Sequence, residues 1–158
     1  MPKTAVWHDP RCGMTLPVVL DADGLDALSD PRPPSALRAL LREAWARDRD
    51  VLIPAIVCAE VCRGVGRTRR VESAVARHDP ERGRRPTVRI VDTDFGLARQ
   101  VGAVLHGVGA GSADIVDAHV VAVCAVRGGG LVVTTDSADI LRLADAVPSA
   151  RIVTRPAR

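Results

Sequence analysis

Short apolar runs alternate with segments of helical periodicity along most of this chain. The apolar runs, which we interpret as strands, cover residues 16–20, 51–53, 87–91, 131–134 and 152–154, and the first of them is typical of a buried strand. The helical segments cover residues 35–47, 54–65, 69–78, 94–106, 113–126 and 137–145. Strands that alternate with helices of about ten or more residues form right-handed βαβ units. The pattern therefore predicts an α/β fold, with a mainly parallel sheet of four to five strands flanked by helices.

The length of 158 residues fits one domain, and we expect residues 14–158 to form it. Residues 1–13 lack periodicity, so we expect either a disordered leader or a segment that precedes the true start at Met14. No apolar run reaches the roughly 18 residues needed to span a bilayer. Trp7, His8 and Asp9 interrupt any apolar signal sequence. We therefore expect a cytoplasmic protein without a membrane segment.

Positive charge gathers in one part of the chain. Between Arg63 and Arg89 there are nine arginines and three acids, a local balance of +6. Because the whole chain carries +3, the other residues must sum to −3. A basic patch beside an acidic remainder is typical of a protein that binds a polyanion, with the reacting phosphate at an acidic, metal-loaded site. A solvated, arginine-rich surface is the alternative.

Two acids follow predicted strands. Asp21 comes directly after the first apolar run, and Asp136 comes directly after LVVTT. In open parallel sheets, ligands bind outside the carboxyl ends of the strands. We therefore expect both carboxylates at the same edge of the sheet.

Two more acids lie inside apolar helical segments, Glu60 in IPAIVCAEVCRG and Asp117 in IVDAHVVAVCAV. A helix cap or an ion pair would explain one such acid, but we expect all four acids to converge. Carboxylates about 4 Å apart repel by roughly 4 kcal/mol per pair at an effective dielectric near 20, so protonation or a cation must offset the repulsion. An all-oxygen site without histidine favours a hard ion, Mg²⁺ or Mn²⁺. Such a site supports hydrolysis of phosphodiesters.

Four motifs follow one another between residues 15 and 155: VVLDADGL, IPAIVCAEVCRG, DAHVVA and LVVTTDSADIL. In this order and spacing they resemble the PIN domain, and particularly the VapC-type toxins of bacterial toxin–antitoxin pairs. The resemblance implies a parallel sheet flanked by helices and cleavage of RNA with Mg²⁺ or Mn²⁺ as cofactor. It also implies a small antitoxin protein as partner, and a homodimer is compatible with the sequence.

The resemblance places the catalytic, metal-binding acids at Asp21, Glu60, Asp117 and Asp136. Thr134 matches the supporting hydroxyl before the last acid. Asp114 and Asp139 would be supporting acids, although Asp139 could equally be a charge at a helix start. Asp23 would be a third supporting acid, at a position where the family usually has Asn or a small polar residue.

Two arginines share the helical face of Glu60. At 100° per residue, Arg63 and Arg67 project within about 60° of Glu60. We expect them to bind RNA phosphates beside the metal, or a carboxylate of an antitoxin. A structural Glu–Arg pair is the alternative. Cys58 and Cys62 project to the opposite face, where we expect small buried residues, because two cysteines alone cannot complete a zinc site.

Other polar residues have simpler interpretations. We expect Asp92 and Asp94 to cap the helix after the third strand. His119 projects away from Asp117, so we do not expect a general base there. Aromatic residues make up 2% of the chain, so base stacking is a poor explanation for RNA binding. We therefore expect the protein to bind RNA through its phosphates and its shape.

Two other functions compete with a nuclease. Asp21-Ala-Asp23-Gly24 resembles the nucleophile motif of haloacid-dehalogenase-like phosphatases. That motif normally continues with threonine, where this chain has Leu25, and it needs a downstream lysine, whereas Lys3 is the only lysine here. A PIN-like module that binds RNA or protein without cleavage is the second alternative. The intact set of four acids argues against it.

Overall fold

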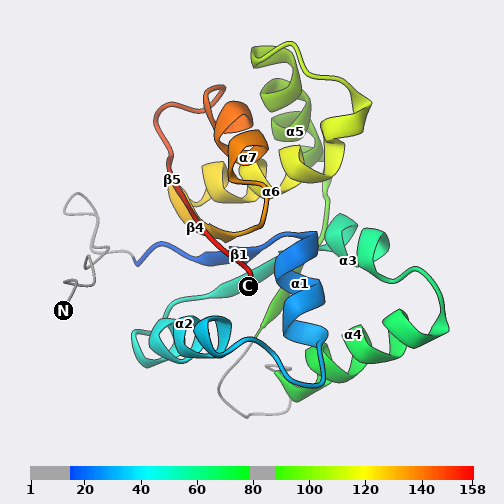
Figure 1. Ribbon diagram of the computed structural model, residues 1–158. Coiled ribbons are helices and arrows are strands. Elements are labelled where there is room, and N and C mark those ends of the chain that lie inside the picture. Colours follow the sequence, from blue (N-terminus) through cyan, green and yellow to red (C-terminus); the bar gives the residue numbers. More distant parts are fainter. Residues whose placement is uncertain (1–14, 79–87) are drawn as a thin grey trace.

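A five-stranded parallel sheet forms the centre of the protein (Figure 1). The computed structural model describes residues 15–78 and 88–158. The strands are β1 (Val18–Leu20), β2 (Val51–Pro54), β3 (Arg89–Val91), β4 (Gly129–Val133) and β5 (Arg151–Arg155). They are ordered β3-β2-β1-β4-β5 across the sheet. The predicted α/β fold with a parallel sheet is confirmed.

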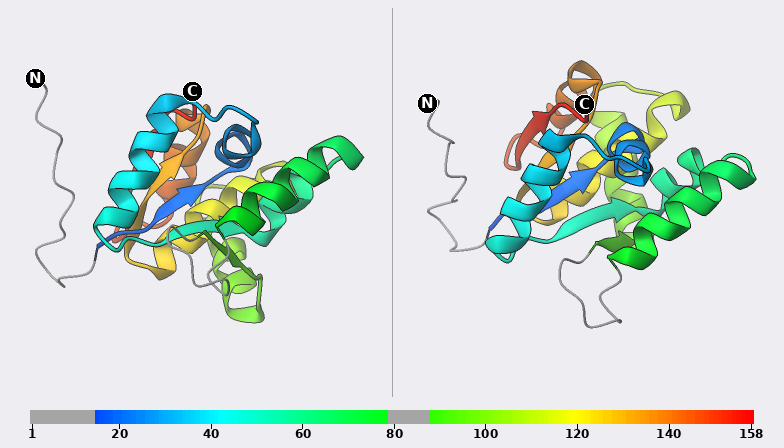
Figure 2. Two further views of the ribbon diagram at one scale, coloured as in Figure 1. Left: turned by 90° about the horizontal axis from the view of Figure 1, so that it is seen from below. Right: turned by 60° about the horizontal axis from the view of Figure 1, so that its bottom comes forward.

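Helices cover both faces of the sheet (Figures 1 and 2). The first group is α1 (Ala22–Ser29), α2 (Ser35–Ala46), α3 (Ala55–Val61) and α4 (Val65–Arg77). The second group is α5 (Phe95–Gly107), the 3₁₀ helix η2 (Ser112–Asp114), α6 (Ile115–Val126) and α7 (Ser137–Ala144). Helices α1, α2 and α4 lie on one face, and α5, α6 and α7 lie on the other (Figure 1). Helix α3 contacts α1, α4 and α6.

The order of the strands creates a crevice between β1 and β4. From β1 the chain builds outward to β2 and β3, then returns to place β4 on the other side of β1. Leu20 and Val133, the last residues of these two strands, are paired. The chain leaves β1 toward α1 on one face and leaves β4 toward α7 on the other (Figure 1). Such a switch point is where open α/β sheets bind ligands, so this edge is the first place to look for a site.

Burial is nearly complete where the first and fourth strands meet α6. All three residues of β1 are fully buried, and the middle of α6 is buried on every side. Two glycines permit close packing here. A Cβ at Gly130 would lie 2.7 Å from Cys124 Sγ, and one at Gly24 would lie 2.8 Å from the Val133 carbonyl oxygen. The first contact packs the end of α6 against the start of β4, and the second packs the start of α1 against the carboxyl end of β4.

Several boundaries differ from the predictions. Helix α1 was not predicted, and it forms because Asp21 caps it and Leu25 and Leu28 are buried. The helix predicted over 54–65 ends at Val61, because Cys62 leaves the helical conformation with a ψ of 48°, and Gly64, with a φ of 90°, precedes the next helix. Helix α4 then starts four residues earlier than predicted. The predicted leader 1–13, the loop before the third strand and Thr87 lie outside the described residues.

Of the two predicted caps before α5, Asp94 is confirmed and Asp92 is wrong. Asp94 Oδ1 accepts a hydrogen bond from the Leu97 amide at 2.8 Å and caps the helix. Asp92 lies too far before the helix to cap it. In the part of the chain that the structure describes, no helix is long and apolar enough to cross a membrane.

Candidate active site

Asp21 lies buried at the carboxyl end of β1. Its side chain caps α1, because Oδ1 accepts a hydrogen bond from the Gly24 amide at 2.8 Å. The residue is 5% exposed. Burial raises the pKa of Asp21 to about 6; hydrogen bonds from Thr134 and Gly24 oppose this rise, and the charges of Asp23 and Asp117 add to it. The ionised form of Asp21 is therefore destabilised by its poorly solvated surroundings.

Asp117 has charge interactions with most of the other acids. It lies in the first turn of α6 and is half-buried. Burial raises the pKa of Asp117 to about 6, and the charges of Glu60, Asp139, Asp136 and Asp114 raise it further, in that order. Mutual repulsion thus links Asp117 to acids from α3 and α7, and to Asp21 from β1. The structure brings the four predicted acids to one region, as the sequence predicts.

Thr134 joins the two strand ends. Its buried hydroxyl forms a hydrogen bond with the Asp21 carboxylate and accepts one from the Asp136 amide at 2.9 Å. Asp136 in turn caps α7, with Oδ1 accepting from the Asp139 amide at 3.2 Å. The predicted supporting hydroxyl therefore fixes one acid on each side of the crevice.

The flanking acids have partners that the sequence analysis missed. The Thr135 hydroxyl donates a hydrogen bond to Asp23. Arg142 of α7 forms ion pairs with Asp114 at 2.7 Å and with Asp139 at 3.3 Å. The spacing of Asp139 and Arg142 could have indicated their pair, since side chains three residues apart meet on a helix. The pair with Asp114 depends on how α6 packs on α7.

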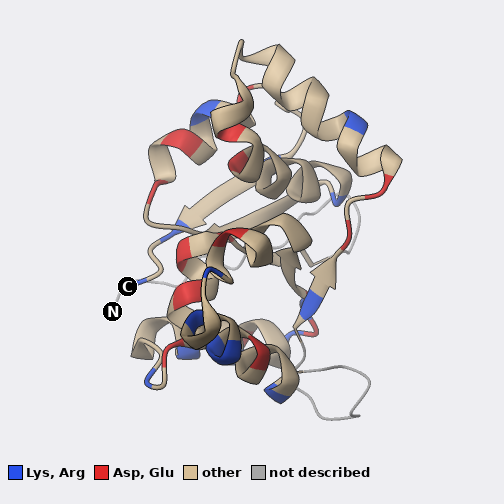
Figure 3. Ribbon diagram, turned by 90° about the vertical axis from the view of Figure 1, so that its right-hand side faces the viewer, with Lys and Arg blue, Asp and Glu red and all other residues tan. Residues whose placement is uncertain are grey.

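Both predicted arginines line a cavity with Glu60. This cavity, about 240 Å³, is lined by Ala22, Asp23, Asp26, Glu60, Val61, Arg63 and Arg67. Among the described residues neither arginine pairs with Glu60, so the structural Glu–Arg pair is not formed there. Asp26 was not predicted here, and it pairs with Arg158 at 3.2 Å. Figure 3 shows acidic segments in the middle of this side of the molecule and basic segments below them.

Residues predicted to lie away from the acids are placed as follows. Cys58 and Cys62 are half-buried rather than buried, which corrects the prediction, and burial raises the pKa of the Cys58 thiol to about 11. His119 is buried with Nδ1 2.7 Å from the Ile115 carbonyl oxygen. A larger cavity of about 520 Å³ lies away from the acids, where Trp45 packs against His78 at the ends of α2 and α4.

The acid cluster comprises seven carboxylates: Asp21, Asp23, Glu60, Asp114, Asp117, Asp136 and Asp139. Oxygen donors of this kind fit Mg²⁺ or Mn²⁺ by their chemistry. Across residues 15–78 and 88–158, however, no three carboxylates, thiols or imidazoles are arranged to hold one metal ion. With pKa values of about 6, Asp21 and Asp117 are partly protonated near that pH. The donor set fits a divalent cation by its chemistry, and Arg142 forms ion pairs with two of its acids.

Comparison with known proteins identifies the family and similar folds. A sequence model of the PIN domain family matches residues 25–146. A chain of the VapBC2 complex of Rickettsia felis, bound to a promoter DNA fragment, is similar with a TM-score of 0.58 and 18% identity over 89% of this chain and 99% of that one. A chain of the FitAB complex bound to the IR36 DNA fragment has a TM-score of 0.55 and 16% identity over 89% and 94%.

At these identities the two structures are similar in fold alone, and no curated protein matches the chain. The family match is independent of them and spans residues from α1 to the end of α7. The chain belongs to the PIN domain family.

Proposed function

We propose that this protein is a metal-dependent endoribonuclease and the toxin of a type II toxin–antitoxin pair. The observation that carries the proposal is the meeting of Asp21, Glu60, Asp117 and Asp136, from four different elements, at the switch point of the sheet. PIN domains are generally nucleases, and those nucleases generally use divalent metals. Neither a stable core nor helix capping requires four acids in this place.

The acids would hold Mg²⁺ or Mn²⁺. When bound, such an ion polarises the phosphate, activates water and stabilises the leaving oxygen. The chain's own residues prepare the site for it: Thr134 orients Asp21 and Asp136, and the core beneath Asp117 excludes water from one side of the cluster. Partial protonation of Asp21 and Asp117 gives way to the ionised form when a cation is near.

The arginines beside the acids would hold the substrate. Arg63 and Arg67 line the same cavity as Glu60, and both are exposed. A guanidinium there can bind a phosphate of the RNA backbone on either side of the bond that is cut. Affinity that depends on phosphate contacts weakens as salt concentration rises.

An antitoxin would act on the same surface. The two similar structures are complexes named FitAB and VapBC2. A carboxylate of a small partner protein could form a bidentate pair with Arg67 and block access to the acids. This proposal predicts that expression of the chain alone inhibits growth and that co-expression of its cognate small protein restores growth.

Cleavage of RNA tests the function directly. We expect the protein to cut total RNA with Mg²⁺ or Mn²⁺ on a denaturing gel, and a chelator to stop the reaction. Asp117→Asn should lower the rate by on the order of 100-fold or more, because one essential charge of the site is lost. Asp145→Asn, at the other end of α7, is the matched control and should cut like the wild type. Equal cleavage by both variants would refute the assignment.

One observation favours a second candidate, a non-catalytic PIN-like module that binds RNA or protein. No three acids of the described residues are arranged to hold one ion. This candidate predicts RNA binding that is unaffected by Mg²⁺ and by Asp117→Asn, with no cleavage under any metal condition. Gel-shift and cleavage measurements on the same RNA separate the two functions.

A further inference from the structure

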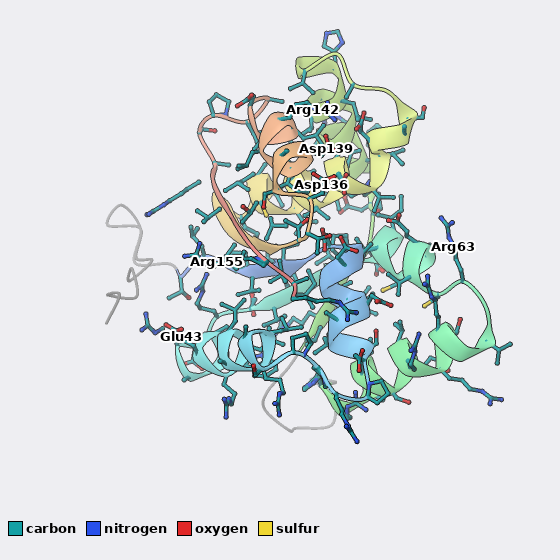
Figure 4. All side chains as sticks on the ribbon, in the orientation of Figure 1. Glu43, Arg63, Asp136, Asp139, Arg142 and Arg155 are labelled. Atoms are coloured by element: carbon teal, nitrogen blue, oxygen red, sulfur yellow. The ribbon has the colours of Figure 1, made fainter. Side chains whose placement is uncertain are left out.

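One guanidinium joins the two acids that flank the proposed metal ligands. Arg142 Nη2 donates to Asp114 Oδ1 at 2.7 Å and to Asp139 Oδ1 at 3.3 Å. Nε of the same side chain lies 3.4 Å from Asp139 Oδ1. Figure 4 shows Arg142, Asp139 and Asp136 along α7, on the side of the sheet that α6 shares. The planar fork of arginine suits this double contact.

The two flanking acids are placed symmetrically about the ligands. Asp114 lies three residues before Asp117 at the start of α6, and Asp139 lies three residues after Asp136 at the start of α7. Each flanking acid is thus about one helical turn from a proposed ligand. By binding both, Arg142 ties together the starts of the two helices that carry Asp117 and Asp136.

Carboxylates of the acid cluster repel one another. Asp114 and Asp139 both repel Asp117. Within residues 15–78 and 88–158, Arg142 is the one cation that forms an ion pair with any acid of the cluster. Its own side chain is 43% exposed, and ion pairs on exposed side chains stabilise a fold little. The double pair therefore adds little to the stability of the fold, and its main effect is on the charges of Asp114 and Asp139.

We propose that Arg142 is the fixed counter-cation of the acid cluster, a positioning residue that holds Asp114 and Asp139 in place and offsets the repulsion of the carboxylates. The inference rests on the proposed function in so far as the cluster is the metal site. It assigns a role to a side chain outside the four proposed ligands. Its consequence is that Arg142 weakens the attraction of the cluster for a divalent ion while it keeps the acids ordered.

Binding of Mn²⁺ alone to the full chain tests the proposal without any RNA. Arg142→Gln removes the charge but keeps a polar side chain, and Arg142→Lys keeps the charge but loses the fork. Arg127→Gln is the matched control, because Arg127 pairs with Asp50 at 3.3 Å, is 44% exposed, and lies at the far end of α6. That end is roughly 18 Å from Asp114 at 1.5 Å per residue.

Calorimetric titration at pH 7.5 should show tighter binding when the charge is removed. We expect the Kd for Mn²⁺ of Arg142→Gln to fall about threefold or more. The effect is modest because solvent and salt weaken the repulsion between the guanidinium and the bound ion. Arg142→Lys and Arg127→Gln should stay within about 1.5-fold of wild type, because one keeps the charge and the other removes a remote one.

The possible outcomes separate this inference from the function on which it rests. If wild type binds Mn²⁺ and Arg142→Gln binds it equally or more weakly, Arg142 is not the counter-cation, and the metal site stands. If Arg127→Gln tightens binding as much as Arg142→Gln, the effect is one of net charge, and the inference is overturned. If no form binds Mn²⁺, the proposed metal dependence fails and the counter-cation role fails with it.

Discussion

Replacing Asp21 with Asn should stabilise the metal-free protein at neutral pH. Folding raises the pKa of this carboxyl from 3.8 to about 6, mainly because the group is buried. At 1.36 kcal/mol for each tenfold change in proton affinity, the ionised form destabilises the fold by roughly 3 kcal/mol well above pH 6. Asn has nearly the same shape and caps a helix as well as Asp, so the hydrogen bond from Gly24 is kept.

The pH dependence follows from the sign of this shift. The pKa of Asp21 is higher in the folded than in the unfolded protein. Below pH about 3.8 the carboxyl is protonated in both the folded and the unfolded protein, so it does not lower folding stability there. The loss of folding stability grows between pH about 4 and 6 and is constant above that range. Asn also needs a partner for its amide group, so we expect a net gain of about 1–3 kcal/mol at pH 7.5. For a chain of this length that is roughly 2–10 °C in melting temperature.

Thermal unfolding in the presence of a chelator, at pH 4 and at pH 7.5, measures this difference. Contributions from acids that do not interact with Asp21 cancel in this comparison, and relief of its repulsion with Asp23 and Asp117 adds to the gain at pH 7.5. Added Mg²⁺ should reverse the order, because only the wild type keeps the carboxylate. The reasoning is refuted if Asp21→Asn is less stable than wild type at pH 7.5, or if its gain is the same at both pH values.

Two further changes test how the crevice is held together. Thr134→Val removes the hydroxyl that accepts from the Asp136 amide and bonds Asp21, so urea unfolding should show a loss of about 1–3 kcal/mol; an unchanged midpoint would contradict the bridging role. Gly24→Ala places a Cβ 2.8 Å from a backbone oxygen of β4 and should cost about 1–3 kcal/mol. Its control, Gly102→Ala on α5, meets open space and should be neutral or stabilising by up to about 1 kcal/mol; equal effects at the two glycines would rule out close packing as the cause.

The strands and the strand-end acids could be predicted because they depend on local pattern. A buried parallel strand is an apolar run, and an acid directly after such a run must lie at the carboxyl edge. Helix α1 could not be found by composition, since Asp23, Gly24 and Asp26 are weak helix formers. It forms because the buried Asp21 caps it and its leucines reach the core. Tertiary packing overrides propensity in such a segment.

The bridge through Arg142 lies beyond sequence reasoning for a different reason. Asp114 and Arg142 are 28 residues apart in the chain, and their contact exists only because α6 packs on α7. Periodicity places each residue on its own helix but says nothing of how one helix is rotated against another. The missed partner of Asp23, Thr135, lies 112 residues away and has the same origin.

Helix capping alone does not explain the acids, and comparison of three caps shows why. Asp94, Asp21 and Asp136 each accept a hydrogen bond from the amide three residues later. Asp94 does so on the surface, outside the acid cluster, where a cap is sufficient explanation. Asp21 caps from a buried position beside Asp117, where Asn or Ser would form the same hydrogen bond without an ionisation cost. The proposed metal site would account for an acid at such a place, because a bound cation requires its negative charge.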